Sequence, residues 1–284
     1  MEVLMVKKVI AIIVILLCIT RPIEINAKTY TTKDNVYSVI KKNLMAHNTE
    51  FTIEMNESTM EAIGTDADLF SIVAAIDDKD TSKDGDYLKL SLIKWSGRWI
   101  LRDSDNTAKL TFSASYRITL AQEKKLDSKI ESVLKALDLK DASDYDKVKA
   151  IHDYIIKRVS YDQNLKKYTA YNALINTSSV CEGYASAAYR MFTDAGIESR
   201  IITGTSDGGG HAWNIVKVDG EWYNIDLTWD DPIMDNGEQT LRYDFFLKNT
   251  EDFENHARDR EYRTKAFIKK YPIAMESYKE LETQ

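Results

Sequence analysis

Cysteine is scarce in this sequence, which has two in 284 residues. Cys18 falls in an apolar stretch near the N-terminus that is typical of a targeting segment, so a processed chain would keep Cys181 alone. One cysteine cannot form an internal disulfide. This scarcity excludes a disulfide framework and leaves two alternatives for Cys181, a buried filler or a reactive thiol.

Positive charge and long hydrophobic runs are also in short supply. Lys and Arg number 38 against 45 Asp and Glu, so the net charge of −7 includes no basic excess that would attract nucleic acid or an anionic membrane surface. The apolar run Val9–Ile19 covers 11 residues, whereas a membrane-spanning helix needs about 20. We therefore expect no nucleic-acid partner and no stable membrane insertion.

The same apolar run has the flanks of a signal peptide. Lys7 and Lys8 precede it, and Ile25-Asn26-Ala27 is an acceptable cleavage site. We predict that residues 1–27 are a cleavable signal peptide, which makes the mature protein secreted or attached at the cell surface. An uncleaved anchor that recruits Val3–Val6 is the alternative.

Residues 28–119 have the pattern of a small α+β module. Helices are expected over 35–45 and 67–76, and strands over 50–55, 87–95, 98–102 and 109–119, with a turn at Ser96-Gly97. The sequence of this module contains no repeat, no low-complexity tract and no catalytic constellation. Two roles stay open for this module. It positions a substrate or the cell wall, or it is only a packing accessory.

A second domain is expected over residues 120–284, and it begins with two helices. Leu120–Leu139 has an amphipathic stripe, and Asp144–Val159 has another. His152 lies beside the apolar stripe of the second helix and next to Asp153 in the sequence. Because neighbouring positions on a helix do not face each other, we interpret His152 as a packed, hydrogen-bonded imidazole rather than a catalytic base.

The stretch 178–229 contains the residues suited to catalysis, starting with a helix. Ser179 and Glu182 form an S-x-x-E capping box, which makes Ser179 the expected N-cap, and Gly196 supplies the C-terminal stop. Cys181 then lies in the first turn, where unpaired backbone N–H groups and the helix dipole favour a thiolate. This position favours the reactive thiol over the buried filler.

A hairpin is expected to follow this helix. Residues 204–210 are expected to be a loop, and 211–228 two strands that pair across the turn signal Asp219-Gly220. In a two-residue hairpin, His211 and Asp226 lie on one face as diagonal neighbours, about 7–8 Å apart at Cα. Asp226 could then hold the His211 ring in one tautomer.

Three stretches of this region resemble motifs of the transglutaminase-like superfamily, in particular of its small bacterial members. They read SVCEGYA at 179–185, GHAWN at 210–214 and WYNIDLTWDDP at 222–232. The resemblance covers about residues 145–260 and implies an α+β, papain-like (transglutaminase-like) core, in which the cysteine-bearing helix packs on an antiparallel sheet. The nucleophile, the base and the third triad member of the family fall on Cys181, His211 and Asp226.

The resemblance implies cysteine-dependent acyl transfer on peptide or protein carboxamides through a thioester. The predicted signal peptide implies that the reaction takes place outside the cytoplasm. Cys181 and His211 are 30 residues apart, much closer than the roughly 130–150 residues of papain-type proteases. A cysteine peptidase or amidase would use the same three residues, and a non-catalytic binding module is a second alternative, against which the complete triad argues. No metal or organic cofactor is required, and the expected partner is a protein or peptide substrate, including one associated with the cell wall.

The second donor of an oxyanion hole has no assignment in the sequence. Tyr161, Tyr171 and Trp213 are candidates for this role or for lining the site. The animal members of the family use an upstream tryptophan, but this sequence has no tryptophan between Trp99 and Trp213.

Two further groups are interpreted as ordinary surface features. Asp230, Asp231, Asp235 and Glu238 lack the spacing of an EF-hand, so they indicate a solvated acidic loop rather than a calcium site. His256 lies in a polar segment that is expected to be helical, and we interpret it as a surface residue.

Overall fold

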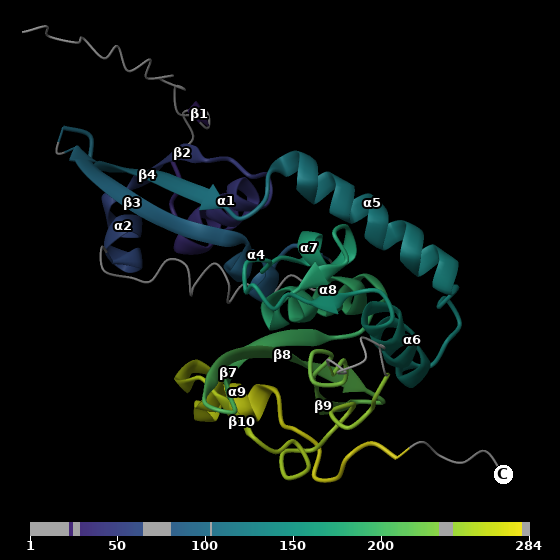
Figure 1. Ribbon diagram of the computed structural model, residues 1–284. Helices are drawn as coiled ribbons and strands as arrows, with labels where there is room; N and C mark the ends of the chain where they lie inside the picture. The colour runs from purple at the N-terminus through teal and green to yellow at the C-terminus, as the bar shows by residue number, and fades with distance from the viewer. Residues whose placement is uncertain (1–22, 25–28, 65–80, 103, 233–240, 280–284) are drawn as a thin grey trace, which may run out of the picture.

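The computed structural model describes residues 23–24, 29–64, 81–102, 104–232 and 241–279, which contain two four-stranded sheets and the helices around them (Figure 1). Their strand orders are β1-β2-β4-β3 and β10-β7-β8-β9. The elements are β1 (Ile23–Glu24), α1 (Lys33–Met45), β2 (Glu50–Asn56), α2 (Glu57–Ile63), α4 (Gly85–Ser91), β3 (Leu92–Arg102), β4 (Thr107–Tyr116), α5 (Leu120–Leu137), α6 (Asp144–Ile156), β5 (Ser160–Tyr161), α7 (Ala170–Leu174), β6 (Ser178–Ser179), α8 (Cys181–Asp194), β7 (Ser199–Ser206), β8 (Gly209–Val218), β9 (Glu221–Ile225), β10 (His256–Arg258), η1 (Arg260–Arg263) and α9 (Lys265–Lys270).

The first sheet confirms the expectation of an α+β module. Strands β2 and β4 alternate between buried and partly exposed residues, as expected where one face of an antiparallel pair meets a core. Helix α1 and strand β2 lie where the sequence predicts them. The helix predicted over residues 67–76 lies outside the described residues.

The hairpin predicted around Ser96-Gly97 is wrong. Strand β3 runs through this pair without a turn, because β4 supplies a partner for every residue from Lys94 to Arg102, with Ser96 opposite Ser113 and Gly97 opposite Phe112. The residues from Tyr87 to Ser91, predicted as strand, instead form most of the helix α4, whose N-cap Asp84 accepts a hydrogen bond from the Gly85 N–H.

Helices α5 and α6 confirm the two amphipathic predictions. Leu126 and Ile130 of α5 are buried, and so are Val148 and Ile151 of α6. Both helices contribute to the hydrophobic cluster that also contains most of the buried face of α8. Figure 1 shows the long teal helix α5 alongside α7 and α8.

The β8–β9 hairpin has the register predicted for a two-residue turn. Val218 pairs with Glu221, and Asp219 and Gly220 both have positive φ angles, 51° and 90°, as in a type I′ turn. The pairing ends at Asn214 and Ile225, so the second strand is shorter than the sequence predicts.

The loop predicted over residues 204–210 is wrong, because β7 and β8 continue into it. Only Asp207 and Gly208, both with positive φ, form the turn between the two strands. Gly204 is required for a different reason. A Cβ at this position would lie 2.0 Å from the carbonyl oxygen of Ala257, so only glycine lets β10 pair closely with β7.

Strand β8 is buried on both faces of its sheet. Ala212 and Val216 belong to the cluster under α8, whereas Trp213 and Ile215 belong to a second cluster on the opposite face. Figure 1 shows α8 on one side of the sheet and the C-terminal segment with α9 on the other. The predicted core, a cysteine-bearing helix packed on an antiparallel sheet, is confirmed.

The first module contacts the second through α4 and the residues just before it. Asp86 accepts two hydrogen bonds from Arg200 of β7, at 2.7 and 2.9 Å. Arg190 of α8 donates to Ser82, which precedes α4, at 2.7 Å. The predicted division of the chain into residues 28–119 and 120–284 stays a prediction.

No helix among the described residues is long and apolar enough to cross a membrane. The predicted signal peptide, residues 1–27, falls almost wholly outside the described part of the chain.

Candidate active site

Cys181 is the first residue of α8, and it is partly buried. The first backbone hydrogen bonds of the helix run from Gly183 and Tyr184 to the Val180 carbonyl oxygen, which leaves the Cys181 N–H outside the helical ladder. The thiol therefore lies at the positive end of the helix dipole, as the sequence predicts.

The capping box predicted for this helix is wrong. Val180 is the N-cap and provides no side-chain cap, whereas Ser179 belongs to β6, which pairs with β5. The Ser179 hydroxyl donates to the Lys167 carbonyl oxygen at 2.7 Å, so it is not available to the helix. Glu182, the other half of the predicted box, lies 3.5 Å from Arg117.

His211 lies between Cys181 and Asp226. Its Nε2 is 2.5 Å from Asp226 Oδ2, and the ring also interacts with the side chain of Cys181. Burial favours the neutral ring, but the hydrogen bonds to Asp226 and Cys181 outweigh it and raise the pKa of His211 to about 10. The contact that the hairpin register predicts between His211 and Asp226 is present.

Asp226 is fully surrounded by donors. Its Oδ1 accepts from the backbone N–H groups of Thr228 at 2.8 Å and Trp229 at 3.2 Å, and its Oδ2 faces two histidine rings. Burial alone would raise the pKa of this carboxyl, yet the hydrogen bonds and charges of His211 and His256 lower it to about 2. Asp226 is therefore an ionised carboxylate that is 1% exposed.

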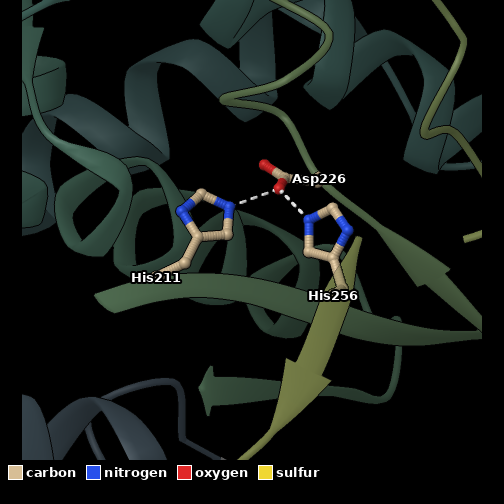
Figure 2. A group of neighbouring side chains, drawn as sticks. All are labelled: His211, Asp226 and His256. Carbon is tan, nitrogen blue, oxygen red and sulfur yellow. Dashed lines mark hydrogen bonds and ion pairs between the residues drawn. The ribbon is translucent and has the colours of Figure 1, made fainter. Parts of the chain in front are cut away.

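The second ring is His256, and its interpretation as a surface residue of a helix is wrong. It begins strand β10, its side chain is 1% exposed, and its Nε2 lies 2.9 Å from Asp226 Oδ2 (Figure 2). Nothing in the local sequence indicated this contact, because 30 residues separate His256 from Asp226 and β10 is held by pairing with β7.

These three side chains are also the group within the described residues that could hold a metal ion. One ligand atom from each of His211, Asp226 and His256 lies within 4.8 Å of the others. However, both nitrogens approach the same oxygen at 2.5 and 2.9 Å, whereas ligands of a tetrahedral zinc ion would be roughly 3.3 Å apart. The arrangement fits a hydrogen-bond network better than a metal centre.

The three candidate lining residues differ in their relation to the site. Burial raises the pKa of the Tyr161 phenol, and the charge of nearby Cys181 raises it further. Trp213 is buried and stacks on His211, with ring centroids 6.0 Å apart. Tyr171 packs on the hydrophobic cluster, and its hydroxyl makes no hydrogen bond to the triad within the described residues.

His152 is packed and hydrogen-bonded, as predicted, and it is fully buried. Its Nε2 lies 3.0 Å from Asp230 and its Nδ1 3.1 Å from Asp153, so the expectation that adjacent residues would not meet is wrong. Its two carboxylate partners account for both ring nitrogens, which leaves none to act as a base.

The expectation of a solvated acidic loop is wrong for Asp230 and Asp231, both of which are buried. Asp231 accepts a hydrogen bond of 2.6 Å from the Tyr184 hydroxyl of α8. Asp235 and Glu238, the other members of that group, lie outside the described residues.

Comparison with known proteins relates part of this chain to one superfamily. Residues 131–227, which include Cys181, His211 and Asp226, match the model of the Transglutaminase-like superfamily (Transglut_core), so the resemblance is confirmed over this segment. Kyphoscoliosis peptidase of Mus musculus is 29% identical over 111 residues, and that of Homo sapiens is 28% identical over 111 residues. Each match covers 33% of this chain and 17% of the relative's length.

Among solved structures, a crystal structure of a TGase aligns with a TM-score of 0.38 and 17% identity. That alignment covers 67% of this chain and 53% of the other.

Proposed function

We propose that this protein is a cysteine-dependent acyltransferase that acts on peptide or protein carboxamides through a thioester. One observation carries the proposal: the His211 ring lies between the Asp226 carboxylate at 2.5 Å and the Cys181 thiol at the N-terminus of α8. A nucleophile, a base within hydrogen-bond reach and a third group that orients the base are the parts that covalent acyl transfer needs.

In the proposed reaction, His211 takes the thiol proton and Cys181 attacks the carbonyl carbon of the substrate. The tetrahedral intermediate then collapses with cleavage of the C–N bond, and His211 returns the proton to the leaving amine. An amine or a water molecule attacks the resulting thioester and restores the thiol. Asp226 holds His211 in the orientation that both proton transfers require.

The electrostatics support the same roles. The ionised Asp226 stabilises the imidazolium that forms on His211, and the helix N-terminus favours negative charge on sulfur. The free Cys181 N–H is a candidate for one donor of the oxyanion hole. Tyr161, whose phenol pKa is raised by burial and by the charge of Cys181, remains the candidate for the second.

The second candidate function is a cysteine peptidase or amidase. It uses the same three residues and differs only in the acceptor, since water rather than an amine resolves the thioester. The name of the mouse and human relatives, Kyphoscoliosis peptidase, favours it. We also propose that the protein acts outside the cytoplasm, because Lys7 and Lys8 followed by the apolar run Val9–Ile19 are typical of an export signal.

Trapping the acyl-enzyme tests the proposal. Purified protein is mixed with an activated ester or a glutamine-containing peptide, quenched in acid and analysed by intact-protein and peptide mass spectrometry. We expect one acyl adduct on Cys181 and none in Cys181→Ala, whose folding is checked by circular dichroism. Addition of a primary amine then separates the two functions, because a transferase yields the amide product whereas a hydrolase yields the free acid. Absence of any adduct with all esters and peptides would favour a binding module.

A further inference from the structure

His256 has an acceptor at each ring nitrogen. Its Nδ1 lies 2.7 Å from the backbone carbonyl oxygen of Glu254, and its Nε2 lies 2.9 Å from Asp226 Oδ2. A carbonyl oxygen can only accept a hydrogen bond, so Nδ1 carries a proton. The Nε2 contact then depends on the protonation state of Asp226.

Asp226 is the ionised partner in this contact. It receives two backbone N–H groups at Oδ1, and at Oδ2 it faces the His211 ring 2.5 Å away as well as His256. The two backbone N–H groups and the His211 ring stabilise negative charge on this carboxyl, so it is ionised and can only accept hydrogen bonds. The Nε2 of His256 therefore donates as well, and the ring is an imidazolium.

Aromatic rings surround this imidazolium. The His256 centroid lies 4.1 Å from that of Phe253, 5.0 Å from Trp229, 5.1 Å from Trp213 and 5.5 Å from Phe245. Cations within about 6 Å of aromatic rings are stabilised by the negative charge of the ring faces. These rings lie within cation–π distance of the His256 ring, whose side chain is 1% exposed.

The charged groups around His256 are few within the described residues. Asp226 and His211 face it on one side, and the ring centroids of the two histidines are 5.4 Å apart. On the other side, a cavity of about 260 Å³ is lined by His256 together with Arg258 and Arg263. Arg258 donates to the amide oxygen of Asn224, not to Asp226, and Glu254 contributes only its backbone carbonyl.

We propose that His256 is a positioning residue of the triad. It is held as an imidazolium that shares Asp226 Oδ2 with His211, and its positive charge weakens the attraction between the carboxylate and the His211 proton. The proposal rests on the proposed function of Cys181 and His211. With His256 charged, its positive charge balances the negative charge of Asp226. The triad together with His256 then has no net charge when Cys181 is a thiol and His211 is neutral, and also when Cys181 is a thiolate and His211 is protonated. Moving the proton from sulfur to nitrogen then leaves no uncompensated buried charge, which would be costly.

The consequence concerns the acidity of His211. Without the neighbouring cation, Asp226 would hold the imidazolium of His211 more strongly, and the ring would return its proton to the leaving amine more slowly. At a separation near that of the two rings, a unit charge shifts a neighbouring ionisation by about 1–2 pH units. His256 therefore keeps His211 a stronger acid than a lone carboxylate would allow.

Histidine-selective NMR tests the charge directly. In wild-type protein with ¹⁵N-labelled imidazoles, both His256 nitrogens should have the chemical shifts of a protonated ring at pH 7. The pattern of a neutral tautomer, with one bare nitrogen, would overturn the proposal. This measurement needs neither a substrate nor a variant.

The variants test the effect on His211. His256→Gln retains a donor for Asp226 without the charge, and Arg258→Gln removes a cation from the same strand that does not touch Asp226. We expect the NMR titration midpoint of His211 to rise by about 1–2 units in His256→Gln and to move by less than about 0.3 units in Arg258→Gln.

The alkaline limb of amide turnover should shift with the His211 midpoint, since loss of the His211 proton removes the general acid. An unchanged midpoint in a folded His256→Gln would overturn the role of His256. A shifted midpoint in a protein that forms no acyl adduct would instead support the inference and remove the proposed function.

Discussion

His211 Nε2 lies 2.5 Å from Asp226 Oδ2, although the pairing of β8 with β9 has already ended at Asn214 and Ile225. The other carboxylate oxygen of Asp226 accepts the Thr228 N–H at 2.8 Å, which turns the chain away from the sheet. One side chain thus ends the strand and orients the base. The contact therefore depends on the turn as well as on the hairpin register.

The reactivity of Cys181 is the first prediction. Because the sulfur lies at a helix N-terminus and hydrogen-bonds His211, iodoacetamide should alkylate it at pH 6–7 faster than a free model thiol. His211→Ala should lower the rate toward that of the model thiol, because only the helix N-terminus then favours the thiolate. Stopped-flow alkylation followed by mass spectrometry measures both, with urea-unfolded protein as the control. Equal rates for the folded and unfolded wild type would contradict the claim that the folded site stabilises Cys181 as a thiolate.

The roles within the triad are the second prediction. Cys181→Ala should abolish thioester formation, whereas Asp226→Asn should slow single-turnover acylation by about 10²–10⁴-fold, because it removes the charge that stabilises the His211 imidazolium. The double variant should match Cys181→Ala, since residues that act as one unit are not additive. Turnover by folded Cys181→Ala would rule out the covalent mechanism.

The close approach of β10 to β7 is the third prediction. Gly204→Ala should lower the free energy of unfolding by about 1–3 kcal/mol, because its Cβ would lie 2.0 Å from the Ala257 carbonyl oxygen. Gly210→Ala is the matched control, since a Cβ there meets nothing within 4 Å. Urea denaturation of the two variants gives the comparison, and equal stabilities would show that β10 can move aside without cost.

The pH dependence of stability at Asp231 is the fourth prediction. Burial raises the pKa of Asp231 to about 6, so the folded state binds a proton that the unfolded state has already lost. Ionisation therefore destabilises the wild type as the pH rises from about 4 through 6, and the loss is complete above that range.

Asp231→Asn should relieve this cost while its amide oxygen still accepts the Tyr184 hydroxyl. The variant should be more stable than wild type by about 1–2 kcal/mol at pH 8, and this advantage should vanish at pH 4. Thermal unfolding at the two pH values checks it, with the exposed Asp244→Asn as the control. A stability gain of the same size at both pH values would contradict the titration argument.

Local sequence was sufficient for the features that depend on neighbouring residues. The φ angles that Asp219 and Gly220 can adopt select the tight turn, and the period-2 alternation of side chains then brings His211 and Asp226 to one face. Helical periodicity likewise predicted the apolar positions of the helix that begins at Cys181, although the capping box proposed for its start was wrong. These patterns act over a few residues, so the sequence can be interpreted without knowing what packs against them.

The tertiary structure alone decided which distant residues join these local elements. Ser179 has the chemistry of an N-cap, but pairing of β6 with β5 directs its hydroxyl to Lys167. His256 reaches Asp226 because β10 pairs with β7 about fifty residues earlier in the chain, where Gly204 leaves room for it. Such contacts depend on the total burial and hydrogen bonding of the folded chain, which no short stretch of sequence contains.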